Sequence, residues 1–391
     1  MPLSPDALLR ARSLFPFLQQ GKLYLNHAAT SPYSTRVVEA LHAYEEERSR
    51  GMLETFMRLD MPMIAAARGL AARMVNAGSP SRIAFTGNTS DALNIVAAGL
   101  PWRAGDRILL NSQEFPANVH PYWHLKARGV AIDMVPCPDG RVPAERLLAA
   151  LTPQTRLLAL SAVQFLSGFR ADLAAIGAEC RRRGVLFVVD AIQAVGNVRV
   201  DVQAAHIDAL ATGCQKWQMS PQGTGYLYLT EELQSRVTPS YLGWLAVEDP
   251  WKFFDFDQPV APDARRFEGG TLNIPGIWGM HAALATLLEF GLEAVEEQIL
   301  HLSSLLTEAL PLIPGVRLFS PADPAERSGI VTVALGPATD AERVFKALLE
   351  RNVTVSLREG KLRYSPHFYN SAADIERAVE ETRIAIAGAR A

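Results

Sequence analysis

The stretch VLFVVDAIQAVG (Val185–Gly196), followed by ALATGCQKWQMSPQGTGYLYL (Ala209–Leu229), is the most informative part of this sequence. Asp190 directly follows an apolar run that is typical of a buried parallel strand. We therefore expect its carboxylate at the carboxyl end of that strand, where open α/β sheets bind their ligands. The alternative is that Asp190 only caps the next turn.

Lys216 in the second stretch is the candidate nucleophile. It lies between Gln215 and Trp217 and precedes a glycine-rich turn into another strand. A lysine in partly apolar surroundings has a lowered pKa and becomes a usable amine, whereas most lysines are solvated surface groups. An acid such as Asp190 could hold a protonated pyridine nitrogen, which turns that ring into an electron sink.

Working outward, apolar runs alternate with helical patterns, which predicts an α/β fold with a mainly parallel sheet. Predicted strands are Ile83–Phe85, Arg107–Asn111, Leu157–Ser161, Val185–Val189 and Tyr226–Leu229. Predicted helices are Thr35–Arg48, Met63–Val75, Ser90–Ala98, Ala117–Arg128, Ala171–Arg183 and Asp201–Ala205.

The character of the sequence changes after about Thr230. Pro239–Arg266 is rich in aromatic, proline and acidic residues and is expected to be a long loop. The patterns then predict a helical stretch at Ile277–Leu310, strands at Ile330–Ala334 and Val353–Leu357, and helices at Asp340–Arg351 and Ala372–Arg390. These elements suggest a smaller α+β domain. The predicted division is an N-terminal segment (1–20) that joins the small domain, a large domain (21–245), and a loop, linking helix and small domain (246–391).

The composition excludes several classes of protein. The chain has 391 residues, 49% of them hydrophobic, with a formal net charge of −3, which gives no sign of a nucleic-acid or acidic-membrane partner. Neither a secretory signal nor a membrane-spanning run is apparent, so a cytoplasmic protein is expected. The three cysteines are widely spaced and suggest neither a zinc site nor disulfides. The chain also lacks GxGxxG after its first strand and the P-loop motif, which argues against a nucleotide-binding protein.

The order D-x-x-Q, then K-W with P-x-G-x-G beyond, resembles class V aminotransferases, which are fold-type I pyridoxal-phosphate (PLP) enzymes. That group includes cysteine desulfurases, selenocysteine lyases and isopenicillin-N-epimerase-like proteins. Further segments resemble the family's motifs in the expected order: YLNHAAT (Tyr24–Thr30), TGNTSDALNIVA (Thr86–Ala97), RRFEGGTLN (Arg265–Asn273) and LRYSPHFYN (Leu362–Asn370). The resemblance covers nearly the whole chain, with a large domain built on a mainly parallel sheet and a smaller α+β domain.

The resemblance implies a role for each matching residue around the cofactor ring. Lys216 would form the internal aldimine with PLP and shuttle the Cα proton. Asp190 would pair with the pyridine nitrogen, and Gln193 would donate to the phenolic oxygen. Arg363 would hold the substrate carboxylate through a bidentate pair, unless it forms only a surface salt bridge. His27 falls in a matched motif and is expected to approach the substrate.

The phosphate end has its own set of implied residues. Asn88, Thr89 and Ser90 open a predicted helix, whose free N–H groups suit a phosphate, although N-capping alone would explain Thr89 and Ser90. Gln215 could add a hydrogen bond to the phosphate. Thr271 would reach the phosphate from the neighbouring subunit, which implies a homodimer; the alternative is a simple turn.

Several positions depart from the family pattern. Where the family often stacks a histidine on the cofactor, Phe115 is expected, and a phenyl ring cannot exchange protons. A family asparagine is replaced around Gln164. Persulfide-forming desulfurases carry a nucleophilic cysteine before the arginine motif, but VTVSLREGKL (Val353–Leu362) has none. We therefore expect an enzyme acting on an amino acid by transamination or β-elimination. Epimerisation and a lyase that resembles desulfurases without the loop cysteine are the alternatives.

Overall fold

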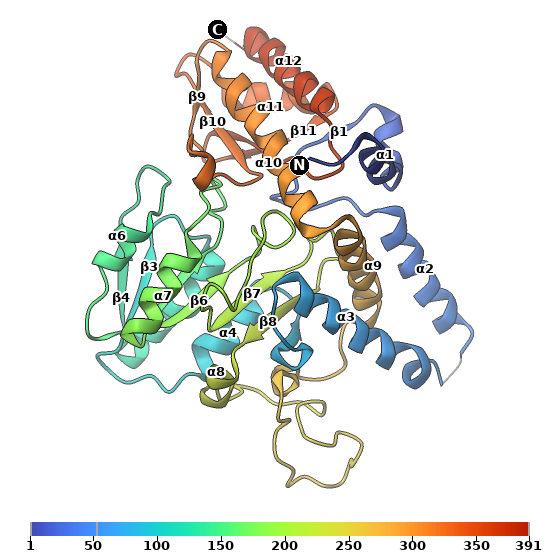
Figure 1. The fold of residues 1–391 in the computed structure, drawn as a ribbon, viewed down its shortest axis with the longest axis vertical. Coiled ribbons are helices and arrows are strands. Elements are labelled where there is room, and N and C mark those ends of the chain that lie inside the picture. Colours follow the sequence, from blue (N-terminus) through green and yellow to red (C-terminus); the bar gives the residue numbers. More distant parts are fainter. Residues whose placement is uncertain (1, 52–53, 390–391) are drawn as a thin grey trace.

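The computed structural model describes residues 2–51 and 54–389 and is built around a seven-stranded sheet (Figure 1). The strands lie in the order β2-β8-β7-β6-β5-β3-β4, and β8 runs antiparallel to both neighbours while the remaining pairs are parallel. Their bounds are β2 Ile83–Thr86, β3 Arg107–Asn111, β4 Ala131–Val135, β5 Thr155–Ser161, β6 Leu186–Asp190, β7 Ala209–Gly213 and β8 Gly225–Leu229. The α/β fold with a mainly parallel sheet is confirmed.

The central strands are apolar on both faces because helices cover both. Leu157 and Ala159 of β5 pack in the same core cluster as Leu93 of α4 (Thr89–Gly99), whereas Leu158 and Leu160 pack in another cluster with Cys180 of α7 (Leu173–Arg183). Alternate side chains of a strand point to opposite faces, so one strand contributes to two cores. This double burial explains the continuous apolar runs by which most of these strands were predicted.

Twelve α-helices are described in the resolved ranges. Their bounds are α1 Pro5–Ser13, α2 Thr35–Ser49, α3 Met61–Met74, α4 Thr89–Gly99, α5 His120–Trp123, α6 Ala144–Ala149, α7 Leu173–Arg183, α8 Glu231–Arg236, α9 Ile274–Phe290, α10 Leu292–Ala309, α11 Ala341–Glu350 and α12 Ala372–Ala389. None of these helices is long and apolar enough to cross a bilayer.

Three helix predictions need correction. Ala117–Arg128 is not one helix but short 3₁₀ and α turns with a break at Val119. Pro121, in the first turn of α5, has no N–H to bond the carbonyl of Ala117 as a continuous helix would require. Asp201–Ala205 forms turns rather than a helix. The stretch Ile277–Leu310 is divided into α9 and α10 at Gly291, whose φ of 86° ends the first helix.

A second, four-stranded sheet lies near the C-terminal helix in the order β12-β13-β10-β9 (Figure 1). Its strands are β9 Val316–Leu318, β10 Val331–Leu335, β12 Ser356–Arg358 and β13 Lys361–Tyr364. The predicted strand Val353–Leu357 is interrupted at Val355, so that β11 (Val353–Thr354) leaves this sheet and pairs in parallel with β1 (Leu23–Tyr24). Residues 23–24, which the predicted division assigns to the large domain, therefore pair with the C-terminal part of the chain.

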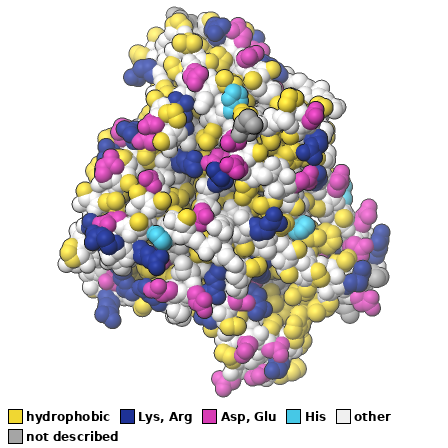
Figure 2. Space-filling view, viewed as in Figure 1, with side chains coloured by type: hydrophobic (Ala, Val, Ile, Leu, Met, Phe, Trp, Pro, Cys, Tyr) yellow, Lys and Arg dark blue, Asp and Glu magenta, His cyan; other side chains and the backbone are white. Residues whose placement is uncertain are grey.

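The predicted long loop before Ala264 protrudes at the lower end of the molecule (Figure 1). Hydrophobic side chains gather over this end (Figure 2), and Phe254 and Phe256 of the loop are 91% and 88% exposed. The domain bounds given above stay a prediction; residue 1 and residues 390–391 of those ranges, including the end of the predicted helix Ala372–Arg390, lie outside the described residues.

Candidate active site

The site lies at the carboxyl ends of the central parallel strands. Asp190 is the last residue of β6, where it pairs with Ser161 of β5 and Ala211 of β7. Lys216 follows the end of β7 by three residues, so both functional side chains come from the same edge of the sheet. This is the edge at which open α/β sheets bind ligands, because the strand ends leave a crevice there.

The backbone around Lys216 is held by distant parts of the chain. Ser31 donates from its N–H to the carbonyl of Gln215 at 2.9 Å and from its hydroxyl to the carbonyl of Lys216 at 2.5 Å. His367 donates from Nε2 to the carbonyl of Trp217 at 2.8 Å. Since Nδ1 of His367 accepts from the N–H of Phe368 at 2.8 Å, the ring must be neutral with its proton on Nε2. The three successive carbonyls of Gln215, Lys216 and Trp217 are thus held by hydrogen bonds.

The amine of Lys216 is buried, and its pKa is lowered to about 8. Burial is the main cause; the charge of Asp190 opposes it, and the charges of Arg363 and Arg358 add to it. Nζ lies 5.7 Å from the centroid of the Phe115 ring. An amine with a lowered pKa spends more time unprotonated near neutral pH, which suits a nucleophile and a proton acceptor.

Asp190 is a buried carboxylate with little compensation. Among the described residues its side chain accepts one hydrogen bond, from the N–H of Ile192 at 3.0 Å. Burial raises its pKa to about 7; the bond from Ile192 lowers it, the charge of Glu114 raises it, and Lys216 lowers it. A buried carboxylate of this kind gains most from a cation placed against it.

Glu114 is a buried carboxylate that the sequence did not reveal. It accepts from the side-chain amides of Asn111 at 2.5 Å, Asn118 at 2.9 Å and Gln164 at 3.1 Å. It also accepts from the N–H and hydroxyl of Ser161, at 2.9 Å and 2.5 Å. Five donors around one carboxylate replace the water it loses on burial. The only sequence signal was an acid directly before Phe115, between two asparagines.

The phosphate end combines a capped helix with unused donors. Asn88 caps α4, accepting from the N–H of Asp91 at 2.9 Å, so the cap is Asn88 and not Thr89 or Ser90. The hydroxyl of Thr89 is buried without a partner. A Cβ added to Gly213 would lie 2.6 Å from Oε1 of Gln215 and 3.2 Å from Oγ1 of Thr89, so these two side chains meet beside a glycine. Ser90 is half-buried at the same helix start.

Arg363 is almost fully buried, and no carboxylate is paired with it among the described residues. Nη1 donates to the carbonyl of Phe165 at 2.6 Å, Nη2 lies 3.5 Å from the hydroxyl of Ser356, and Nε has no partner. Burial and the charge of Arg358 lower its pKa to about 10. The alternative of a surface salt bridge is therefore wrong, and the guanidinium keeps donors for an anionic ligand.

The sequence matches a known protein family over most of its length. The profile of the family described as Aminotransferase class-V matches residues 23–377. The chain belongs to the class V aminotransferase family. A probable cysteine desulfurase of Methanothermobacter thermautotrophicus is 30% identical, over 95% of this chain and 96% of that protein.

Solved structures of the family are similar over almost the full length. The apo cysteine desulfurase of Thermococcus onnurineus NA1 has a TM-score of 0.89 at 25% identity, over 99% of this chain and 100% of that one. The cystine C–S lyase C-DES, solved with its reaction product cysteine persulfide, has a TM-score of 0.86 at 26% identity, over 94% and 99%. This class V enzyme is therefore a PLP-dependent transferase or lyase.

The residues present fit this cofactor. The buried hydroxyl of Thr89 lacks a partner beside a helix N-terminus, as a phosphate site requires. The carboxylate of Asp190 lacks a cation other than the nearby Lys216, as a site for a protonated pyridine nitrogen requires. Gln193 accepts from Nε1 of Trp217 at 2.8 Å and donates to the carbonyl of Ala28 at 3.0 Å, which leaves one amide hydrogen for the cofactor.

His27 lies in the interior with both ring nitrogens engaged. Nδ1 lies 2.8 Å from the carbonyl of Ser365, and Nε2 lies 2.8 Å from the hydroxyl of Tyr369. Its predicted contact with the substrate stays a prediction, and the structure gives it a packing role. His367, which the sequence did not single out, is the histidine bonded next to Lys216. It could be recognised only by its position within the LRYSPHFYN motif.

Thr271 lines a cavity that Lys216 does not line. That cavity has a volume of about 310 Å³ and is lined by Gly87, Tyr241, Gly270 and Thr271, among others, but not by Lys216 or Asp190. Thr271 is exposed. Its predicted role in a neighbouring subunit stays a prediction.

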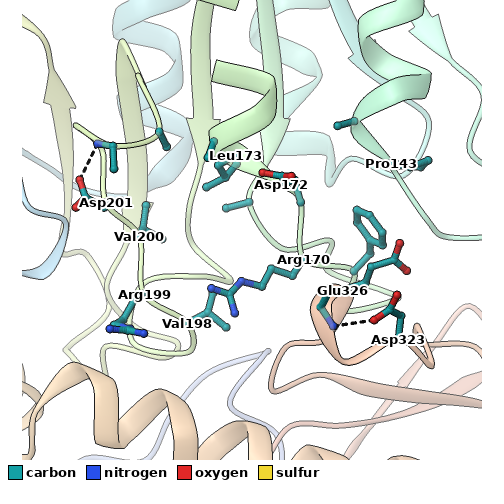
Figure 3. Close-up of a pocket in the computed structure, with 18 of the residues that line it drawn as sticks. Pro143, Arg170, Asp172, Leu173, Val198, Arg199, Val200, Asp201, Asp323 and Glu326 are labelled. Atoms are coloured by element: carbon teal, nitrogen blue, oxygen red, sulfur yellow. Dashed lines mark hydrogen bonds between the residues drawn. The ribbon is translucent and has the colours of Figure 1, made fainter. Parts of the chain in front are cut away.

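A second cavity, of about 580 Å³, lies outside the site (Figure 3). Arg170 and Arg199 both extend toward it, yet both are bonded to Glu296, at 2.9 Å and 2.6 Å. A second carboxylate, Glu293, lies 3.7 Å from Arg199, so the two guanidinium charges face two carboxylates and, among the described residues, neither arginine is unpaired as Arg363 is.

Proposed function

We propose that this class V enzyme is a C–S lyase that removes a sulfur group from the β-carbon of an α-amino acid. The net reaction converts an S-substituted cysteine and water into pyruvate, ammonia and the free thiol or persulfide. The bond broken is Cβ–S, whose electron pair leaves with the sulfur, and the proton lost is that of Cα. The similarity to the cystine C–S lyase supports this substrate class.

The chain's own residues would divide the work as follows. Arg363 would bind the α-carboxylate through donors that have no carboxylate partner in the protein. Bound PLP would supply the electron sink for negative charge at Cα, and Asp190 would hold the proton on its ring nitrogen. The amine of Lys216, with its pKa lowered to about 8, would take the Cα proton.

One observation favours a lyase over a desulfurase that forms a persulfide on an enzyme cysteine. The segment that bears the nucleophilic cysteine in persulfide-forming desulfurases is here a tight hairpin, in which β12 and β13 are joined by Glu359 and Gly360 alone. Their φ values of 48° and 69° are those of a type I′ turn. Such a hairpin has neither the cysteine nor the loop length to carry sulfur to an acceptor.

The cysteines elsewhere in the chain are poorly suited to nucleophilic attack. Cys137, Cys180 and Cys214 are all buried, and burial raises the pKa of each thiol. A thiol with a raised pKa contains little of the reactive thiolate near neutral pH.

Phe115 limits the leaving groups that the site can handle. Its ring is near Lys216 but has no proton to give. Among sulfur leaving groups, a persulfide or an acidic thiol departs as an anion most easily, which favours disulfide substrates such as cystine.

We also propose that the enzyme acts as a homodimer in which Thr271 reaches the phosphate site of the other subunit. Support comes from the exposed Thr271 and the nearby exposed aromatic loop. Sedimentation should give a dimer. Thr271→Ala should weaken PLP binding severalfold without dissociating the subunits.

The test of the lyase proposal is a product analysis with purified holoenzyme. Cystine should give pyruvate, ammonia and soluble persulfide in equal amounts. A variant with Cys137→Ala, Cys180→Ala and Cys214→Ala, checked by circular dichroism for folding, should keep most of this activity. A protein-bound persulfide, or loss of activity in the folded triple variant, would contradict the proposal. A keto acid that retains its sulfur would instead establish transamination.

A further inference from the structure

Two exposed histidines, His120 and His124, lie one helical turn apart on α5 and the 3₁₀ turn that continues it. Of the eight histidines in the sequence, these are the only two that are four positions apart. The N–H of His124 donates to the carbonyl of His120, which closes a complete α-helical turn between them. Side chains at this spacing are neighbours on one face, with Cβ atoms about 5–6 Å apart. The backbone therefore holds the two imidazoles side by side.

Both histidines line the same cavity. This cavity has a volume of about 320 Å³, and its lining also includes Ser90, Asn94 and Phe115. Ser90 and Asn94 belong to α4, so the cavity lies between the start of that helix and the histidine turn. The ring of Phe115 is also the one that lies 5.7 Å from Nζ of Lys216, and the cavity therefore borders the active site.

The polar side chains of this cavity have unused acceptor atoms. Among the described residues, neither histidine ring has a hydrogen bond, an ion pair or a ring contact. Asn94 donates from Nδ2 to the carbonyl of Ser90 at 2.9 Å, which turns the amide so that Oδ1 keeps its lone pairs free. A neutral imidazole has one ring nitrogen with a free lone pair. The cavity is thus lined by two such nitrogens and one amide oxygen.

This set of atoms is one that a transition metal prefers. A single exposed histidine is usually only solvated, and one alone would carry no site. Two histidines four positions apart on one helix face can bind the same zinc ion, because the turn presents both nitrogens to it. Zinc takes four ligands from nitrogen, sulfur and oxygen, and a site with three protein ligands leaves one position for water. The cavity provides room for that water beside the ion.

We propose that His120, His124 and Oδ1 of Asn94 form a binding site for a divalent transition-metal ion such as Zn²⁺, with water as the fourth ligand. Imidazole suits Zn²⁺, Cu²⁺ and Ni²⁺, whereas Mg²⁺ prefers a shell of oxygen ligands and is excluded. None of the three ligands takes part in the proposed lyase reaction. The metal site and the lyase function therefore stand or fall separately.

The first test is a calorimetric titration of the holoenzyme with Zn²⁺ and with Mg²⁺. One Zn²⁺ should bind per chain, and Mg²⁺ should not bind. His120→Ala and His124→Ala should each weaken Zn²⁺ binding by about 100-fold, because the second imidazole on the same turn acts at a high effective concentration. His301→Ala, which removes a lone exposed histidine, is the matched control and should change nothing. Equal Zn²⁺ affinities in the holoenzyme and both folded variants, or no Zn²⁺ binding at all, would overturn the inference.

The second test identifies the ligands directly. With Cu²⁺ as the probe, electron paramagnetic resonance should show coupling to two imidazole nitrogens in the holoenzyme and to one in either histidine variant. Asn94→Asp places a carboxylate oxygen where the amide oxygen was, and the added charge should tighten Zn²⁺ binding by about tenfold. Coupling to fewer than two imidazoles in the holoenzyme, or no gain in Asn94→Asp, would contradict the assigned ligands. Both readouts are independent of enzymatic activity.

Discussion

Arg68 and Arg363 are both buried arginines, but only Arg68 has its charge compensated by a carboxylate of the protein. A buried charged group that the protein itself compensates is called complete, and one that it leaves uncompensated is called incomplete. Arg68 forms a paired contact with Glu268, at 2.5 Å and 3.1 Å, donates to the carbonyl of Ile83 at 2.7 Å, and lies 4.5 Å from the ring of Phe85. Arg363 contacts a carbonyl and, at 3.5 Å, a hydroxyl, and its Nε has no partner. The first guanidinium is part of the framework, and the second has its donors available for a ligand.

The two buried carboxylates repeat this contrast. Glu114 accepts five hydrogen bonds, whereas the side chain of Asp190 accepts one. A buried charge that the protein itself compensates serves stability, and one that it leaves uncompensated costs stability until a ligand binds. Changes at complete groups should therefore destabilise the fold, and changes at incomplete groups should affect activity.

The largest effect is expected at Asp190. Asp190→Asn keeps the shape and the bond from Ile192 but cannot hold a proton on the cofactor ring, so kcat should fall by about 10³-fold. The apo protein should be at least as stable as the wild type in urea unfolding, because a costly buried charge has been removed. A clear loss of stability would show that Asp190 belongs with the complete groups.

Glu268→Gln should act in the opposite way. It leaves Arg68 buried without its counter-ion, so the free energy of unfolding should fall by about 3 kcal/mol or more. Steady-state kinetics below the unfolding temperature should give an unchanged KM. Replacing both partners, with Arg68→Met and Glu268→Gln, should recover part of the loss, and failure to do so would argue against a specific pair.

Arg363→Met removes an incomplete cation. We expect kcat/KM to fall by about 10²-fold through the lost contact with the α-carboxylate. Arg363→Lys should recover only part, because lysine cannot form a bidentate pair. The stability of the apo protein should not fall, which thermal unfolding can check. An unchanged KM in Arg363→Met would exclude the carboxylate role.

The pH dependence of apo stability provides a finer test. The pKa of Asp190 is raised to about 7 in the folded state, so between its ordinary pKa and pH 7 the folded protein retains a proton that the unfolded chain has lost. Stability from this group is complete at low pH and is lost as pH rises. The difference in unfolding free energy, wild type minus Asp190→Asn, should fall by about 2 kcal/mol from pH 5 to pH 7. Lys216, whose pKa is lowered to about 8, changes its protonation mainly above pH 7 and therefore contributes little to the change between pH 5 and pH 7. A flat difference would contradict the raised pKa.

The smallest effect is expected at His367, which acts on Lys216 only through the carbonyl of Trp217. His367→Ala should lower kcat by about tenfold and shift the pH at which the cofactor's absorbance changes, because the lysine backbone loses one anchor. His367→Gln can still donate to that carbonyl and should recover most of kcat. Equal defects in both variants would assign His367 to packing alone.

The sequence predicted well whatever depends on neighbouring residues. Most strands of the seven-stranded sheet were visible as apolar runs, and the position of Asp190 directly after one of them placed it correctly at the carboxyl edge of the sheet. Two strands were missed, β4 and β7. Strand β7 reads ALATG, and it is buried by its neighbours rather than marked by large or branched side chains. The broken helix at Ala117–Arg128 shows that one proline can outweigh a favourable pattern.

The residues that the sequence did not reveal depend on contacts between distant segments. Glu114 is bonded to residues of β5 and of the loop beyond it, and His367 contacts a residue 150 positions earlier. No local period or motif encodes such pairs, since each side chain obtains its partner only when the fold is complete.

The three fixed carbonyls around Lys216 have a consequence for how this protein comes into being. One anchor, Ser31, is made early in translation and the other, His367, near its end, so the lysine loop is held only after both ends of the chain have docked. In a truncated or half-synthesised chain, the Lys216 loop would lack the hydrogen bond from His367. Competence to capture a reactive aldehyde is thereby tied to finishing the polypeptide.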